Sequence, residues 1–265
     1  MLETLSDASE GIAAPLSPNL EQRYGGPLRL PTGRPFVYAN FVSTLDGVVS
    51  FGSPTAEAKH ISRGFASDRF VMALLRAVAD VVVIGAGTLR AERGAVLTPE
   101  QAFPAARDDF ARLRTALGKP AQPTAVVVSA TGRIDGAARL FQSGQRVVVV
   151  TSEAADPGAR AALPDVEWRI AAGAPPSGRQ LLDAIADLGP AVLCEGGPAL
   201  LGTMLAAGVV HELFLTIAPQ LAGRSPTERR LGLVEGVAFT PAQAPWGRLR
   251  GIKRDGDYLF LRLAL

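Results

Sequence analysis

The sequence predicts an α/β protein with a mostly parallel central sheet, helices on both faces and antiparallel strands near the C-terminus. Short apolar runs alternate with helical segments along most of the chain, as expected for parallel strands that are buried on both faces. Glycine-rich turns follow two of these runs directly. The last two apolar runs alternate more openly with polar residues, which is typical of antiparallel strands that close one edge of a sheet.

The regular elements follow one another from residue 36 onward. A strand is predicted over 36–42, an amphipathic helix over 68–79 and a buried strand over 81–84. The helix carries Phe70, Leu74, Leu75 and Val78 at helical spacing, and its polar residues Asp68, Arg69 and Arg76 are expected to face water. Further strands are predicted over 125–128, 147–150, 166–170, 191–194, 211–217 and 258–263, and helical segments over 99–119, 179–187 and 199–207.

Composition excludes several classes of protein. Hydrophobic residues make up 48% and charged residues 20%, which is an ordinary balance for a globular protein and favours a single folded domain. Residues 1–34 are expected to form an arm before this domain. The arm is expected to be partly mobile and to lie across the domain or a partner subunit. With 27 basic and 25 acidic residues and no basic run, no nucleic-acid partner is expected. Neither a targeting segment nor an apolar run of membrane-spanning length is visible, so no membrane partner is expected. The lone Cys194 excludes an intrachain disulfide and favours a reducing, cytoplasmic compartment; with only two histidines, no metal site is expected.

Two glycine turns predict a site for phosphate groups. Glu195-Gly196-Gly197-Pro198 joins an apolar strand to a helix, and Gly85-Ala86-Gly87-Thr88 follows the strand over 81–84. Without Cβ atoms, such turns let a ligand approach backbone amides at the start of a helix. The alternative is that glycine only permits a tight turn here, because the third glycine of the full dinucleotide motif is missing.

Two further turns carry polar groups at strand ends. Ser129 and Arg133 offer a hydroxyl and a guanidinium, with no acid before Asp135. If this turn contacts the adenosine ribose, a basic residue favours NADPH over NADH; otherwise it is an ordinary solvated turn. Asp46 follows the first strand, and in an apolar crevice its carboxyl group could hold a proton, although Asp-Gly is more often a simple turn.

The motifs together resemble a known family. Residues 43–47, Asp80 with the valine run into residues 85–88, residues 195–198 and residues 215–219 look like the RibD C-terminal reductase family of riboflavin biosynthesis, which is similar in fold to dihydrofolate reductase. The resemblance implies a reductase domain over 35–265. It also implies NADPH-dependent reduction of the ribose of 5-amino-6-(5-phosphoribosylamino)uracil to the ribitylamino product, and a homodimer.

The resemblance assigns roles to individual residues. Asp46 matches the family's acidic position in the substrate site and is expected either to donate the proton or to stabilise the cationic imine. Glu195 is the second candidate catalytic carboxylate, with anchoring of backbone amides or of the substrate's edge as its alternative role. The expected cofactor contacts are Gly85, Gly87, Thr88, Gly196 and Gly197, with Ser129 and Arg133 near the 2′-phosphate. The expected substrate contacts are Asn40 and Ser43, and the cations available for its phosphate are Lys59, Arg63, Arg69, Arg90 and Arg93; taken singly, each cation also fits a plain surface charge.

Two departures from the family pattern keep other functions open. Many members have Asp-Asp-Pro after the second glycine turn, where this chain has residues 90–94, Arg-Ala-Glu-Arg-Gly. The zinc deaminase domain that often precedes this reductase needs paired cysteines, and this chain has only Cys194. The alternatives are an NADPH-dependent reductase of a pteridine or other small carbonyl or imine, and a nucleotide-binding protein without catalysis.

Overall fold

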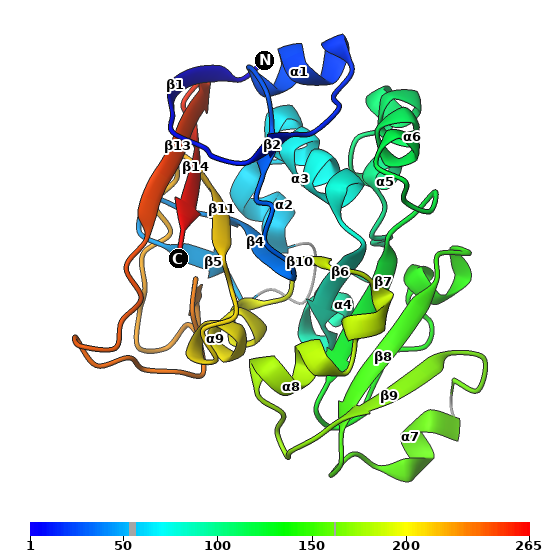
Figure 1. Ribbon diagram of the computed structural model, residues 1–265. Coiled ribbons are helices and arrows are strands. Elements are labelled where there is room, and N and C mark those ends of the chain that lie inside the picture. The colour runs from blue at the N-terminus through cyan, green and yellow to red at the C-terminus, as the bar shows by residue number, and fades with distance from the viewer. Residues whose placement is uncertain (53–56, 162) are drawn as a thin grey trace.

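The computed structural model describes residues 1–52, 57–161 and 163–265. Its main feature in these residues is a ten-stranded sheet, in which the strands from β11 to β9 run parallel and β14, β13 and β1 extend the other edge antiparallel (Figure 1). In sheet order the strands are β1 (Glu3–Asp7), β13 (Arg248–Asp255), β14 (Tyr258–Ala264), β11 (Glu212–Ile217), β4 (Phe36–Ser43), β10 (Ala191–Cys194), β6 (Val81–Gly85), β7 (Thr124–Ser129), β8 (Val147–Ser152) and β9 (Glu167–Ala171). The predicted fold class is confirmed.

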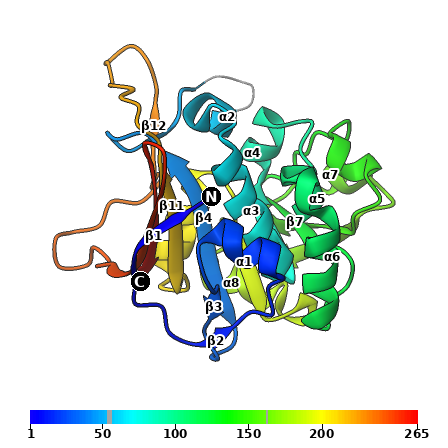
Figure 2. The ribbon, with the colours of Figure 1, turned by 90° about the horizontal axis from the view of Figure 1, so that it is seen from above.

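Helices cover both faces of this sheet. Side chains of β4 alternate, so Phe36 and Tyr38 pack toward α3, while Val37 and Ala39 pack toward α9. Figures 1 and 2 show α1, α3 and α6 on one side, and Figure 1 shows α8 and α9 on the other. The helices are α1 (Pro18–Tyr24), α2 (Glu57–Ser62), α3 (Ala66–Val78), α4 (Ala86–Ala91), α5 (Pro99–Ala102), α6 (Arg107–Ala116), α7 (Pro157–Ala161), α8 (Gly178–Asp183) and α9 (Pro198–Ala206).

Smaller elements complete the fold. Short strand pairs join β2 (Ile12–Ala13) to β3 (Arg29–Leu30) and β5 (Val48–Ser50) to β12 (Leu231–Gly232). Single 3₁₀ turns occupy Pro104–Ala106, Arg139–Gln142 and Ala186–Leu188. The first of these divides the helical segment predicted over 99–119, because a proline cannot donate a backbone hydrogen bond within a helix.

The order of the strands creates a crevice. From β4 the chain moves two positions along the sheet to β6 and outward to β9, then returns to insert β10 between β4 and β6, and finally adds β11 on the other side of β4. Ligands of open α/β sheets bind at the carboxyl ends of the strands where the direction of winding changes. That position lies here at the ends of β4, β10 and β6.

The first 34 residues pack against the antiparallel part of the sheet. β1 pairs with β13, and Leu20 and Leu28 are fully buried in the core under this segment. Figure 2 shows β1 and α1 lying over the sheet and α3. The sequence pattern missed β1, α1 and β13, because their apolar residues are few and β1 is positioned only by its pairing with β13 near the other end of the chain.

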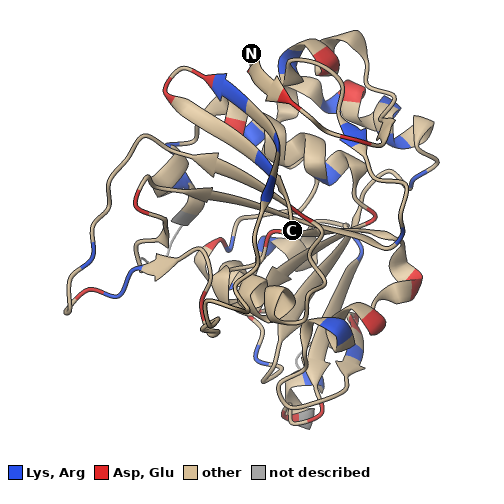
Figure 3. Cartoon of the chain, turned by 60° about the vertical axis from the view of Figure 1, so that its left-hand side comes forward, with Lys and Arg blue, Asp and Glu red and all other residues tan. Residues whose placement is uncertain are grey.

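Two polar residues of α3 correct the sequence-based orientation of this helix. Asp68 and Arg76 are only 5% and 6% exposed, although both were expected to face water, whereas Arg69 is exposed. The helical period separates polar from apolar faces but does not distinguish a face toward solvent from one toward an internal cavity. No helix in the described residues is long and apolar enough to cross a membrane. Basic and acidic residues are interspersed over the molecule (Figure 3).

Candidate functional site

A cavity of about 650 Å³ opens at the carboxyl ends of β4, β10 and β6. This volume lies within the usual range for small-molecule sites. The end of β4 and one side of α3 form one wall, the two glycine turns and α4 form another, and the segment around β12 contributes a third. All of the predicted phosphate-binding residues of the two turns line it, namely Gly85, Gly87, Thr88, Gly196 and Gly197.

The two glycine turns touch each other because β10 and β6 are neighbours. A Cβ atom on Gly196 would lie 3.1 Å from the backbone nitrogen of Gly85, and a Cβ atom on Gly197 would lie 3.2 Å from Thr88 Oγ1. Both contacts are tighter than ordinary Cβ contacts, so close packing of the turns favours glycine at these positions. The result is a continuous, side-chain-poor wall that ends where α9 begins at Pro198.

Ser129 and Arg133 lie next to this wall but outside the cavity. β7 is paired with β6, so the end of β7 follows the Gly85 turn along the sheet edge. The hydroxyl of Ser129 is buried and donates to the carbonyl oxygen of Arg133 at 3.2 Å, while the Arg133 side chain is exposed. Their position is compatible with a ligand that extends from the cavity over β7.

Glu195 forms a buried ion pair with Arg76. Arg76 Nε lies 3.1 and 3.0 Å from the two carboxylate oxygens, Arg76 Nη2 donates to one of them at 2.7 Å, and both side chains are 7% exposed. Arg76 Nη1 also donates to the carbonyl oxygens of Val96 and Thr98. The pair therefore holds the Glu195 carboxylate at a fixed place in the cavity wall, where it can accept hydrogen bonds from a ligand.

Asp68 is the functional candidate that the sequence did not reveal. It lies in the first turn of α3, lines the cavity and forms hydrogen bonds with the hydroxyl groups of Thr216 and Ser62. Burial raises the pKa of its carboxyl group to about 6, the two hydroxyl groups oppose that rise, and the charge of Glu195 adds to it. The only signal in the sequence was a carboxylate at the start of the helix predicted over 68–79, which directly precedes the strand predicted over 81–84.

Asp46 lies in the turn between β4 and β5 and does not line the cavity. Its carboxylate accepts hydrogen bonds from the backbone amides of Ala222 (3.0 Å) and Gly223 (2.7 Å) and from the hydroxyl of Thr44 (2.6 Å). The Ala222 amide, the Thr44 hydroxyl and the Gly223 amide hold the pKa of this carboxyl group well below its usual range. In this geometry Asp46 anchors the loop at Ala222 and Gly223, and its catalytic role stays a prediction.

The predicted substrate contacts separate into two groups. Asn40 and Arg90 line the cavity. Ser43 is buried at the end of β4 and its carbonyl oxygen accepts from Ala218, and the remaining cations, Lys59, Arg63, Arg69 and Arg93, are exposed and outside the described cavity lining. Arg93 pairs with Asp135 at 2.6 Å. Arg229, beside β12, lines the cavity and was missed, since nothing in its local sequence marks it.

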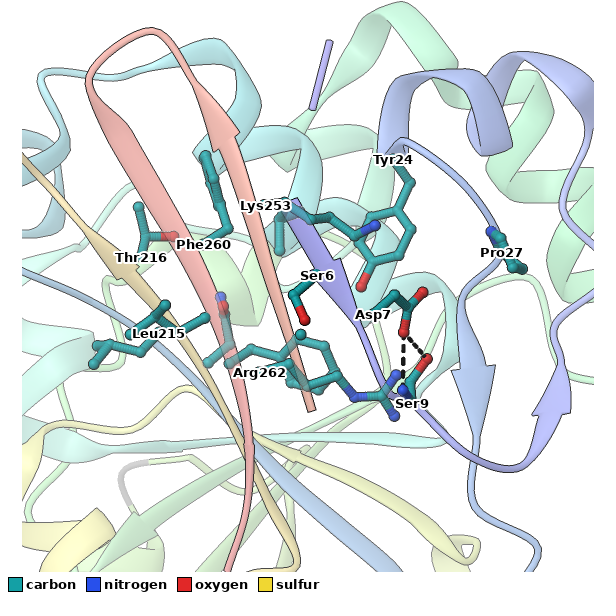
Figure 4. Close-up of a pocket in the computed structure, with 15 residues that line it drawn as sticks. Ser6, Asp7, Ser9, Tyr24, Pro27, Leu215, Thr216, Lys253, Phe260 and Arg262 are labelled. Atoms are coloured by element: carbon teal, nitrogen blue, oxygen red, sulfur yellow. Dashed lines mark hydrogen bonds between the residues drawn. The ribbon is translucent and has the colours of Figure 1, made fainter. Parts of the chain in front are cut away.

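A second cavity lies between the N-terminal segment and the antiparallel strands (Figure 4). Its volume of about 30 Å³ is comparable to that of one water molecule, so it does not fit a substrate. Lys253 Nζ donates to Thr4 Oγ1 at 2.6 Å beside it, and Asn40 and Thr216 lie between this cavity and the large one. Within the described residues, no group of three or more His, Cys, Asp or Glu side chains is placed to hold a metal ion.

Comparison with known proteins agrees with this architecture. The family model for the RibD C-terminal domain matches residues 35–244. Riboflavin biosynthesis protein RibD of Mycobacterium tuberculosis is 28% identical over 210 residues, which cover 77% of this chain and 49% of that protein. The chain therefore spans about half the length of this curated relative.

Solved structures resemble the chain in fold. A pyrimidine reductase-like protein from Corynebacterium diphtheriae superposes with a TM-score of 0.69 at 24% identity, covering 87% of this chain and 92% of that one. RibD of Acinetobacter baumannii superposes with a TM-score of 0.62 at 22% identity, covering 88% and 58%. These likenesses establish the fold, and the family model extends over well more than half of the sequence. The protein therefore belongs to the RibD C-terminal domain family.

Proposed function

We propose that the protein reduces the ribose of 5-amino-6-(5-phosphoribosylamino)uracil to a ribitylamino group, with NADPH as the reductant. The observation that carries this proposal is the contact between the two glycine turns at the edge of a cavity that also contains the Glu195–Arg76 pair. Membership of the RibD C-terminal family and the description of its relatives as riboflavin biosynthesis proteins support the substrate class.

The residues present fit a dinucleotide. A cofactor phosphate needs backbone that it can approach closely, and the glycines at 85, 87, 196 and 197 leave their own backbone uncovered by Cβ atoms. When bound, NADPH supplies the hydride. Arg133 lies at the end of the neighbouring strand, and a basic residue beyond the phosphate wall favours the 2′-phosphate of NADPH over the free hydroxyl of NADH.

Polar side chains that line the cavity fit a phosphorylated sugar on a polar base. Arg90 and Arg229 can bind the substrate phosphate, because guanidinium groups bind phosphate in a bidentate manner. Glu195 is held by Arg76 as an acceptor, and Asn40 offers both a donor and an acceptor, so together they can bind the edge of a pyrimidine. In this arrangement Arg76 acts as a positioning residue for Glu195.

The test is oxidation of NADPH by the purified protein with the phosphoribosylamino pyrimidine, a dihydropteridine or no second substrate, each repeated with NADH. We expect turnover with the pyrimidine and NADPH. Preference for the pteridine would contradict the proposal and favour a reductase of another substrate. NADPH binding without turnover on either substrate would contradict it and favour a nucleotide-binding protein without catalysis. Arg133→Ala serves as the cofactor variant and should reduce the preference for NADPH over NADH.

We further propose that the protein is a cytoplasmic homodimer. The outer side of the antiparallel strands carries apolar residues that remain partly accessible, and Leu249 is 43% exposed there. With regard to the cytoplasmic compartment, Cys194 is buried and desolvation raises its pKa to about 12, which fits a structural rather than a reactive thiol. Light scattering should give twice the mass of the chain, and a monomeric mass at micromolar concentration would contradict the dimer.

A further inference from the structure

Asp68 differs from Glu195 and Glu235, which also line the large cavity. Glu195 is bound through both oxygens to Arg76, and Glu235 accepts the backbone amide of Gly232 at 2.8 Å. The hydrogen-bond partners of Asp68 are instead two hydroxyl groups, which can donate to a carboxylate or accept from a carboxylic acid. The site therefore accommodates both protonation states of Asp68.

The charged groups near Asp68 in the described residues come from three sides. Glu195, which follows β10 directly and is paired with Arg76, is one charged neighbour. On the side of α2, the Tyr258 hydroxyl donates to the Ser62 carbonyl oxygen at 3.1 Å, and Arg63 lies near Tyr258. On the side of β11, Thr216 and Asn40 stand between Asp68 and the small cavity of Figure 4, whose charged residues are Asp7, Lys253 and Arg262.

We propose that Asp68 is the proton donor of the reduction. The inference rests on the proposed function, and Asp68 takes the place of Asp46, whose carboxylate is occupied by the loop that it anchors. The substrate ribose opens to an imine, whose carbon accepts the hydride of NADPH while the C=N electron pair moves to nitrogen. The nitrogen takes the proton of Asp68 as its O–H bond breaks. The products are the ribitylamino group, NADP⁺ and the Asp68 carboxylate, which water reprotonates.

A donor of this kind predicts a characteristic pH profile. Because burial raises the pKa of Asp68 to about 6, the protonated fraction falls about tenfold for each pH unit above that value. Turnover that depends on protonated Asp68 should decline in the same way. Thr216→Val removes a hydrogen bond that lowers this pKa, so the decline should move to higher pH while turnover is retained.

The experiment compares wild-type protein, Asp68→Asn, Thr216→Val and the exposed control Asp183→Asn in steady-state turnover from pH 5 to 9. General acid catalysis contributes about 10²- to 10⁴-fold, so Asp68→Asn should lose turnover by about that factor and lose the decline above pH 6. The affinity of Asp68→Asn for NADPH, measured by fluorescence, should stay within about threefold of the wild-type value, since the change leaves the two glycine turns intact. Asp183→Asn should match the wild type.

A second readout is independent of turnover. In the cofactor-free protein, ¹³C NMR of side-chain carboxyl groups should show a group that titrates near pH 6, that is absent in Asp68→Asn and that is shifted upward in Thr216→Val. Titration of Asp68 at its ordinary pKa near about 4 would overturn the proposal. Wild-type turnover and pH profile in a folded Asp68→Asn variant would also overturn it, while leaving the proposed function intact. Absence of turnover in the wild type would overturn the proposed function, and this assignment with it.

Discussion

The turn after β4 and the first turn of α3 each carry one aspartate near the large cavity, and their surroundings are opposite. Asp46 lies at the surface and accepts three hydrogen bonds, two of them from backbone amides more than 170 residues away in sequence. Asp68 is 5% exposed and contacts two hydroxyl groups. Amide donors favour the ionised carboxylate and burial favours the neutral acid. The pKa values of the two carboxyl groups are therefore shifted in opposite directions.

This difference assigns separate tasks to the two turns. By binding the amides of Ala222 and Gly223, Asp46 holds the segment that leads to Arg229 and β12, which forms one wall of the cavity. Asp68 faces the cavity itself. The first carboxylate supports a wall of the cavity, and the second lies in the cavity lining.

The largest effect is expected when the charge balance around Asp68 is broken. Arg76→Met leaves the buried Glu195 without its partner and close to Asp68, and removing one member of a buried ion pair typically costs about 3 to 5 kcal/mol in free energy of unfolding. Urea denaturation at neutral pH measures the loss. The double variant Arg76→Met with Glu195→Gln should recover part of it, and a double variant as unstable as the single one would contradict the explanation.

The pH dependence of stability tests Asp68 directly. Its pKa is raised from 3.8 to about 6 in the folded state, so its contribution to stability is fully present below pH 3.8 and is lost as pH rises through 6. At about 1.4 kcal/mol per pKa unit, the loss is about 3 kcal/mol. Unfolding free energies of wild type and Asp68→Asn at several values from pH 4 to 7 should show this slope only in the wild type. Parallel curves for the two proteins would contradict it.

A variant in the wall formed by the two glycine turns tests cofactor binding separately from the roles of Asp46 and Asp68. In Gly196→Ala the new Cβ atom would meet the Gly85 backbone, which cannot easily move, and Leu200, which can rotate away. Overpacking of this kind costs about 1 to 3 kcal/mol, and calorimetry should show weakened NADPH binding with an unchanged Asp68 titration. Gly87→Ala is the matched control for folding, since its Cβ atom would meet only the end of the Arg90 side chain at 3.8 Å. Unchanged NADPH affinity in Gly196→Ala would contradict the proposed wall.

The smallest effect is expected at Asp46, and its sign is opposite to that at Asp68. The pKa of Asp46 is lowered in the folded state, so its contribution to stability is present above pH 3.8 and lost as the solution is acidified below it. Asp46→Asn should therefore lower the melting temperature at pH 7 and have no effect at strongly acidic pH. Limited proteolysis of residues 218–230 should become faster. A variant that abolishes turnover while the loop stays protected would return the catalytic role to Asp46.

Local sequence patterns were sufficient to predict the parallel strands of the sheet and the turns that follow them. The strands β6, β7, β8 and β10 are continuous apolar runs, and the turns with Gly85 and Gly196 follow them directly, so strand and turn are visible within about ten residues of sequence. The N-terminal strand β1 was not visible in this way, because its five residues are all exposed and its pairing partner β13 lies near the other end of the chain.

By itself, the sequence determined the fold class and the two glycine turns, because buried parallel strands and tight turns are encoded by neighbouring residues, and the resemblance of its motifs indicated the family. Only the tertiary structure decided in which direction the pKa of each aspartate shifts. The pKa of an aspartate depends on burial and on donors that fold against it, and the amides at Asp46 and the hydroxyl of Thr216 at Asp68 come from segments far away in the chain.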